Sequence, residues 1–259
     1  MSDTDILEQP IVAMVRKLEA RNAKLQEALQ AASQEIESLT YSIAHDLRTP
    51  LMHVDGFAQL LQSSPGAVLD PESRDHLQRI IQAARKMNEL IGALVEYARV
   101  NSAELVAGDL DLEHVLEAAL EQLRPSIDGR NIQWRRTRLP TIRADEALLR
   151  QVFFSLVTNA LKYTGPRDPA IIEIGARPDQ DRQVVVFVRD NGVGFDMKYA
   201  TKLFSPFQRM HSTDAFPGVG MGLAKVRRVV TRHGGRVWAD ATLGAGATFF
   251  FSLPRDVDA

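Results

Sequence analysis

Apolar residues recur at heptad spacing between about Ile11 and Leu39. There are two series of positions, one starting at Ile11 and the other at Val15, and each recurs every seven residues. Together they interleave in alternating steps of four and three residues. Over four heptads this spacing is typical of a parallel coiled coil, and a polar member of the series such as Asn22 fixes the register of such a dimer. The alternative is a single amphipathic helix on the surface of its own domain, which would need a wider apolar stripe.

The spacing changes around His45. Leu39, Ile43, Leu47 and Leu51 follow one another in three steps of four residues. This is a stutter, which locally unwinds a supercoil. We therefore hypothesise that helix packing around His45 is where a conformational signal acts.

Two consecutive helices are predicted up to about residue 102. The first continues to a break at Ser63–Gly66, and the second starts near Pro71 with Asp70 as its N-cap. The apolar face of the second helix consists of Leu77, Ile80, Ile81, Ala84, Met87, Leu90, Ile91, Leu94 and Ala98. Because a helical hairpin buries little by itself, we expect two copies to pair as a four-helix bundle.

Helical and strand patterns mix beyond a boundary at Asn101–Asp111. Asp145 is a candidate N-cap for the longest helix of this part. A mixture of this kind favours an α/β sandwich, with one sheet under a layer of helices. We expect helices over residues 112–123, 145–163 and 223–233, and strands over residues 132–134, 171–176, 184–189, 236–242 and 248–253.

Composition narrows the class of protein. The net charge is −2, from 31 basic and 33 acidic residues, and no dense basic run occurs, which argues against nucleic acid or an anionic membrane as the main partner. The absence of cysteine excludes disulfides and thiolate metal sites. No run approaches 18 apolar residues, so we expect no membrane insertion and take the cytoplasm as the default location.

His45 is the candidate nucleophile. A neutral imidazole can attack phosphorus without prior deprotonation, provided that one ring nitrogen is held and the other points outward. The neighbouring Asp46 can hold that nitrogen and help to remove the proton. Thr49 shares a helix face with His45, and Pro50 removes one backbone hydrogen bond and bends the helix.

A second set of residues has the properties of a nucleotide site. Asn159 can offer an amide oxygen to Mg²⁺, and Lys162 and Tyr163 follow on the same helix with a charge for phosphate and a ring for adenine. Asp190 ends an apolar strand and would be half-buried, where an adenine amino group is a suitable donor for its carboxylate. By itself, each of these segments is equally typical of an ordinary helix end or turn.

Glycines complete this second set. Gly192 and Gly194 permit a tight turn close to a flat ligand. Gly218, Gly220 and Gly222 immediately precede a helix, where backbone N–H groups favour phosphates. The intervening residues 196–217 have the pattern of a lid over the nucleotide, with Phe204 and Phe207 either anchoring it or belonging to the core.

Five motifs in a fixed order carry a family resemblance. They are Ser42–Leu51, Asn159–Thr164, Asp190–Phe195, Leu203–Phe207 and Gly218–Leu223. In these residues the chain resembles the two-component sensor histidine kinases over about residues 38–254, most closely the type found after phytochrome or PAS sensor modules. The resemblance implies an α+β protein with four parts: a coiled-coil signalling helix (1–38), a dimerisation and phosphoacceptor domain (39–102), a linker (103–111) and a catalytic ATP-binding domain (112–259).

The resemblance also implies roles for single residues. His45 would be autophosphorylated from ATP, with Asp46 as its acid/base partner, and Thr49 would position water for dephosphorylation of a response regulator. In the ATP site, Asn159 would hold Mg²⁺ and Arg209 would contact the γ-phosphate. The remaining roles are phosphate contact for Lys162, adenine contact for Tyr163 and Asp190, and shaping of the pocket and lid for Gly192, Gly194, Gly218, Gly220 and Gly222.

The implied partners are a second copy of the chain, a response regulator receiver domain and an upstream sensor module or protein. Two positions depart from the family pattern: Ser155 replaces a second asparagine, and Val219 replaces a threonine between the glycines. Two other functions stay open, the first of them because of Ser155. One is a phosphotransfer or phosphatase scaffold whose ATP domain no longer turns over, and the other is a non-kinase ATPase related to chaperones or topoisomerases.

Overall fold

The computed structural model describes residues 3–64, 69–102, 104–178, 183–210, 216 and 218–255. It divides into two compact units, Met1–Ser102 and Ala103–Ala259. Part of the predicted lid (211–215 and 217), the Pro65–Gly66 break and the side chains of Ile11 and Leu29 lie outside the described residues.

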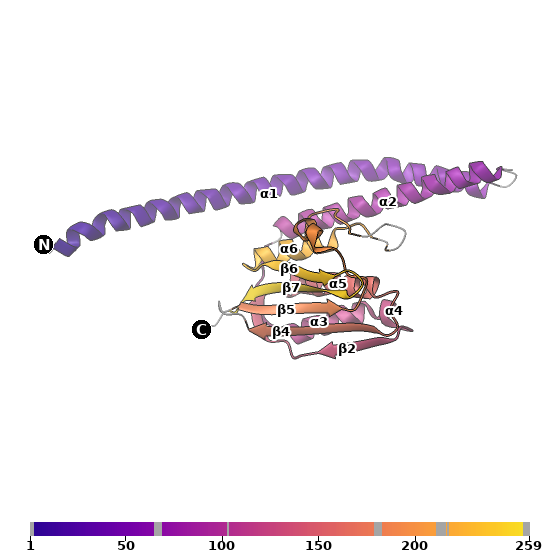
Figure 1. Ribbon diagram of the computed structural model, residues 1–259. Helices are drawn as coiled ribbons and strands as arrows, with labels where there is room; N and C mark the ends of the chain where they lie inside the picture. The colour runs from indigo at the N-terminus through magenta and orange to yellow at the C-terminus, as the bar shows by residue number, and fades with distance from the viewer. Residues whose placement is uncertain are drawn as a thin grey trace. The chain divides into compact units, whose positions relative to one another are not determined.

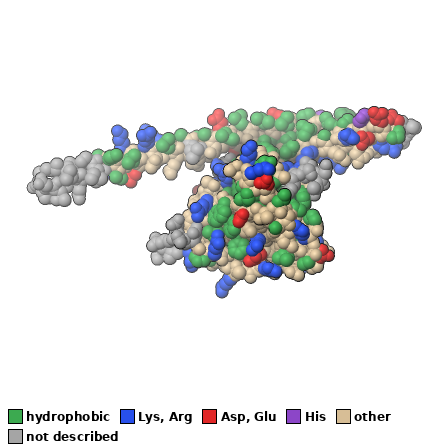
Figure 2. Space-filling model, in the orientation of Figure 1, with side chains coloured by type: hydrophobic (Ala, Val, Ile, Leu, Met, Phe, Trp, Pro, Cys, Tyr) green, Lys and Arg blue, Asp and Glu red, His purple; other side chains and the backbone are tan. Residues whose placement is uncertain are grey.

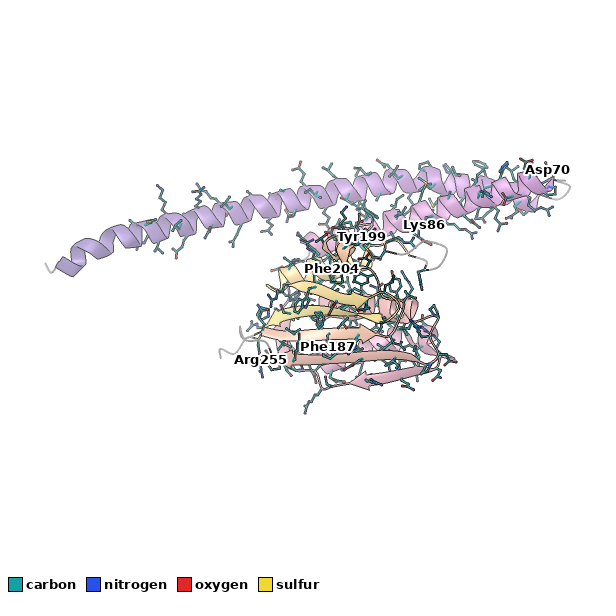
Figure 3. All side chains as sticks on the ribbon, in the orientation of Figure 1. Asp70, Lys86, Phe187, Tyr199, Phe204 and Arg255 are labelled. Atoms are coloured by element: carbon teal, nitrogen blue, oxygen red, sulfur yellow. The ribbon has the colours of Figure 1, made fainter. Side chains whose placement is uncertain are left out.

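The first unit is a helical hairpin. Helix α1 covers Asp3–Ser63 and runs without interruption through Pro50, and α2 covers Pro71–Ser102 beside it (Figure 1). The predicted N-cap is confirmed, because Asp70 Oδ1 accepts a hydrogen bond from the Ser73 N–H at 2.8 Å at the start of α2 (Figure 3). This backbone hydrogen bond from Ser73 is also the main cause that lowers the pKa of Asp70.

Each helix of the hairpin has two heptad-spaced apolar rows, of which only one is buried. The buried rows are Ala44, Leu51 and Ala58 on α1 and Leu77, Ala84, Ile91 and Ala98 on α2. The other rows are Leu47, Val54 and Leu61 on α1 and Ile80, Met87 and Leu94 on α2, and they are 36–57% exposed. Figure 2 shows apolar side chains gathered on the surface along this hairpin.

The second unit combines two sheets with helices, which confirms the predicted mixed α+β class but corrects the expectation of a single sheet, because the strand pair β1-β3 forms a sheet of its own. Its elements are β1 (Gly108–Asp111), α3 (Leu112–Gln122), α4 (Arg124–Ile127), β2 (Ile132–Arg136), β3 (Thr141–Ala144), α5 (Glu146–Tyr163), β4 (Ala170–Pro178), β5 (Gln183–Asp190), the 3₁₀ helix η1 (Met197–Lys202), α6 (Gly222–Arg232), β6 (Val237–Thr242) and β7 (Gly246–Pro254). Four short elements were not predicted: β1, β3, α4 and η1. Strand β1 lies within the stretch expected to be a linker.

The main sheet has the strand order β2-β4-β5-β7-β6, with β2 parallel to β4 and the other pairs antiparallel. Helices α5 and α6 pack on one face of it, and α3 packs on α5 (Figure 1). The core between the layers includes Phe153 of α5 and Phe251 of β7, whose rings meet edge to face with centroids 5.9 Å apart. Phe187 on β5 packs beside Phe250 of β7 (Figure 3).

Candidate functional site

Asp190 ends the central strand β5, and its side chain is more deeply buried than the expected half-burial. It is 4% exposed, because β5 lies between β4 and β7 with α5 across one face. Oδ1 accepts a hydrogen bond from the Gly192 N–H at 2.8 Å, whereas Oδ2 is buried without a partner among the described residues. Burial raises the pKa of Asp190 to about 6, although the N–H groups of Gly192 and Ala247 oppose the rise. A buried acceptor without a donor marks a position where a ligand could supply one.

The two glycines after Asp190 have different neighbours. A Cβ at Gly192 would lie 2.6 Å from the Tyr163 carbonyl oxygen and 2.7 Å from Asp190 Oδ1, so only glycine lets this backbone approach. Gly194 has a φ of +60° and packs against the carbonyl of Thr242, the last residue of β6. Gly192 therefore contacts the Asp190 side chain and Tyr163, while Gly194 packs the loop that follows Asp190 against strands β6 and β7.

The C-terminal turn of α5 brings a charge and a ring to the same place. Asp145 caps the other end of this helix by accepting a hydrogen bond from the Leu148 N–H at 3.0 Å, as predicted. Lys162 Nζ lies 4.5 Å from the centroid of the Tyr163 ring. The pKa of the Tyr163 hydroxyl is raised above its usual value, mainly because the group is buried, and the nearby positive charge of Arg209 partly opposes this rise.

Phe216 joins this group although no sequence pattern pointed to it. Its ring packs on Tyr163 with the centroids 5.1 Å apart and the planes at 54°. An isolated aromatic residue in a loop has no periodic neighbours, so no pattern distinguishes it from an ordinary surface residue. Only the tertiary structure places the Phe216 ring beside Tyr163, the residue predicted to contact adenine.

The glycine-rich segment approaches α5 and is held by Arg209. The Arg209 guanidinium donates to the carbonyl oxygens of Gly218, at 3.0 Å, and Phe216. A Cβ at Gly218 would lie 3.5 Å from Lys162 Nζ, and one at Gly220 would lie 2.7 Å from the Gln208 carbonyl oxygen.

Helix α6 begins at Gly222, whose nearest neighbour is Ser155 on α5; a Cβ there would lie 3.8 Å from that of Ser155. The start of α6 therefore lies beside Ser155, one of the two positions that depart from the family pattern.

Asn159 is half-buried on α5, one turn after Ser155 and about one turn before Lys162. Within the described ranges no cluster of three or more His, Cys, Asp or Glu side chains could hold a metal ion. One amide oxygen fits Mg²⁺ that arrives with phosphates, because this ion keeps several waters and takes few protein ligands.

The candidate nucleophile belongs to the first unit. His45 follows the buried Ala44 on α1, and its own side chain is 71% exposed. Its Nδ1 lies 3.2 Å from Asp46 Oδ1, as the sequence suggested, and Thr49 is also exposed. The imidazole is thus held at one nitrogen and faces solvent.

No helix in the described ranges has the length and apolar character needed to cross a membrane. Two family models match the chain: the His Kinase A (phospho-acceptor) domain over residues 35–103, and the Histidine kinase-, DNA gyrase B-, and HSP90-like ATPase over residues 144–257.

Curated relatives and solved structures are similar over most of the chain. The phytochrome-like protein Cph1 of Synechocystis sp. is 31% identical over 96% of this chain, which spans only 33% of Cph1. The adaptive-response sensory kinase SasA of Synechococcus sp. is 32% identical over 92% of this chain and 63% of SasA. A crystal structure of full-length ShkA in complex with AMPPNP superposes with a TM-score of 0.59 at 29% identity, covering 84% of this chain and 45% of ShkA.

Proposed function

We propose that this chain, which belongs to the family of two-component sensor histidine kinases, is an ATP-dependent protein histidine kinase. It would phosphorylate its own His45 and pass the phosphate to an aspartate of a response regulator. The observation that carries the proposal is the gathering of Asp190, Tyr163, Lys162 and the segment from Gly218 at the end of α5. Each of these groups matches one part of ATP.

The adenine end is supported by the buried carboxylate. Asp190 Oδ2 lacks a donor among the described residues, and the exocyclic amino group of adenine is one. Tyr163 offers a ring face close by. The relative ShkA was crystallised with AMPPNP, an analogue of ATP, which agrees with this assignment.

The phosphate end is supported by charge and by a helix terminus. Lys162 Nζ lies beside Gly218, and α6 starts four residues later, so a cation and the N–H groups of a helix start converge there. Asn159 would hold Mg²⁺, which would supply positive charge to neutralise the charge that develops on the phosphates. Arg209 is available for the γ-phosphate once it leaves its carbonyl partners.

The acceptor chemistry follows from the His45–Asp46 pair. With Nδ1 held by Asp46, Nε2 is the nitrogen that attacks the γ-phosphorus. A bond forms between Nε2 and phosphorus, the bond from phosphorus to the β-phosphate oxygen breaks, and ADP leaves. We further propose that Thr49 positions water when the phosphorylated regulator is hydrolysed.

The exposed apolar rows of the hairpin support a homodimer. Leu47, Val54, Ile80 and Met87 repeat at heptad spacing on the two helices and have no cover within one chain. A second hairpin would bury them in a four-helix bundle, and α1 would continue as the parallel coiled coil toward an upstream sensor.

The direct test is incubation of the chain with γ-labelled ATP and Mg²⁺. We expect an acid-labile, base-stable label on the wild type and on the control His76→Gln, whose histidine is an exposed residue of α2. No label should form on His45→Gln. An acid-stable label, or a label that persists in His45→Gln, would contradict the proposal.

A phosphatase or transfer scaffold is the second candidate, because Ser155 occupies a position beside Gly222 where the family has an amide. It predicts nucleotide binding without autophosphorylation, together with dephosphorylation of a phosphorylated regulator. Measuring both reactions on the same preparation separates the two functions.

A further inference from the structure

Arg167 lies in the segment between α5 and β4, outside all five motifs. Its Nη2 donates hydrogen bonds to the carbonyl oxygens of Gly192, at 3.1 Å, and Gly244 in the turn between β6 and β7. Its backbone N–H donates to the Thr164 carbonyl at 2.9 Å. The Nε atom is buried. The guanidinium group therefore ties the end of α5 to two other segments.

The segment that Arg167 holds is the loop that follows Asp190. The peptide between Gly192 and Val193 is fixed at both ends: Arg167 binds its carbonyl, and the Tyr163 carbonyl accepts its N–H at 3.2 Å. The Val193 carbonyl accepts the Gly244 N–H at 2.7 Å. The N–H of Gly192, in the peptide immediately before, is bonded to Asp190 Oδ1, so the position of Gly192 helps to fix that of the carboxylate.

We propose that Arg167 is a positioning residue for adenine recognition, acting through the Gly192 carbonyl on the carboxylate of Asp190. This inference rests on the proposed function. A charge-assisted hydrogen bond holds a backbone group more strongly than a neutral one. A loop that is already ordered before binding loses less entropy when the nucleotide arrives. Without Arg167 the carboxylate would have to be oriented during binding, and selection for the amino group would weaken.

The test uses the full chain with ADP and inosine diphosphate, which carries a carbonyl where adenine has the amino group. For Arg167→Met we expect the Kd for ADP to rise about 10-fold while the Kd for inosine diphosphate changes less, so that discrimination between the two narrows. The KM for ATP should rise in parallel, with the autophosphorylation rate at saturating ATP unchanged. Arg167→Lys should restore part of the affinity, since an ammonium can still reach one carbonyl. Arg150→Ala, an exposed arginine on α5, is the matched control.

Three results would overturn the inference. The first is unchanged ADP binding in Arg167→Met when the wild type binds ADP. The second is equal weakening for both diphosphates with a lower urea midpoint, which would show a merely structural role. A wild-type chain that binds neither nucleotide would overturn the proposed function and the inference with it.

Discussion

Replacing Asp190 with asparagine should stabilise the nucleotide-free protein while it weakens nucleotide binding. The carboxylate is 4% exposed and burial raises its pKa from 3.8 to about 6. That difference corresponds to about 3 kcal/mol by which folding disfavours the charged form. The introduced asparagine would carry no charge, but its amide N–H would also lack a partner in the empty site. We therefore expect a net gain of about 1–3 kcal/mol at pH 7.5.

The pH dependence gives this prediction a definite sign. Because the pKa is higher in the folded state, the native protein binds more protons than the unfolded chain between about pH 4 and pH 6. The stability that protonation of Asp190 provides is complete below pH 4 and is lost as the pH rises through 6. The advantage of Asp190→Asn should accordingly be largest above pH 6 and should vanish near pH 4.

Urea unfolding followed by tryptophan fluorescence can measure the effect in the intact chain. Both tryptophans, Trp134 in β2 and Trp238 in β6, belong to the second unit, so the signal reports on that unit alone. In calorimetric titration the same variant should bind ADP about 10- to 100-fold more weakly, because it loses a hydrogen bond to a charged acceptor.

A matched control is Asp196→Asn, which removes the same charge from an exposed N-cap. Asp196 accepts hydrogen bonds from Lys198, and these lower its pKa, so its stabilising contribution is lost as the pH falls and its replacement should destabilise at pH 7.5. An Asp190→Asn variant that is no more stable than the wild type at pH 7.5, or whose stability gain does not change between pH 7.5 and pH 4, would refute the reasoning.

Two further substitutions test the packing described above. Gly194→Ala should destabilise the second unit by at least about 2 kcal/mol in the same urea assay, because φ is +60° and the new Cβ would overlap the Thr242 carbonyl. The control Gly129→Ala, at φ +79° in open space, should destabilise it less. Equal losses of stability in the two variants would argue against the overlap. Val54→Glu should convert the proposed dimer to a monomer in sedimentation analysis, because Val54 lies in one of its exposed apolar rows. Val106→Glu, also at an exposed valine, should leave the dimer intact, and a dimeric Val54→Glu would exclude this row from the interface.

The long elements were predictable because each repeats a pattern over many residues. Helix α2 shows its apolar period from Leu77 to Ala98, and β5 contains the continuous apolar run Val184–Val188. The strands β1 and β3 have only four residues each, and they exist because they pair with one another across the intervening α3, α4 and β2. No local pattern of that length identifies a strand.

The candidate site was predictable where a residue type implies chemistry, as for His45 and Asp190. Its supporting contacts were not, because they join residues far apart in the chain. Arg167 reaches Gly192 and Gly244 across 25 and 77 positions, and Phe216 reaches Tyr163 from a loop. In the sequence these are an ordinary arginine and an ordinary phenylalanine, and only the folded chain gives them neighbours.

Because helix α1 is unbroken, the number of residues between its N-terminal segment and His45 determines the direction in which the His45 side chain points relative to that segment. His45 stands on the same continuous helix as the predicted coiled-coil positions of residues 11–39, and no loop separates them. Each residue of an α-helix turns the chain by about 100°. An insertion of one residue before position 39 would therefore point the imidazole in a different direction relative to the N-terminal segment, whereas an insertion of seven would return it almost to its original azimuth. The direction in which the proposed phosphoacceptor faces, relative to the N-terminal segment, thus depends on the number of residues between the two.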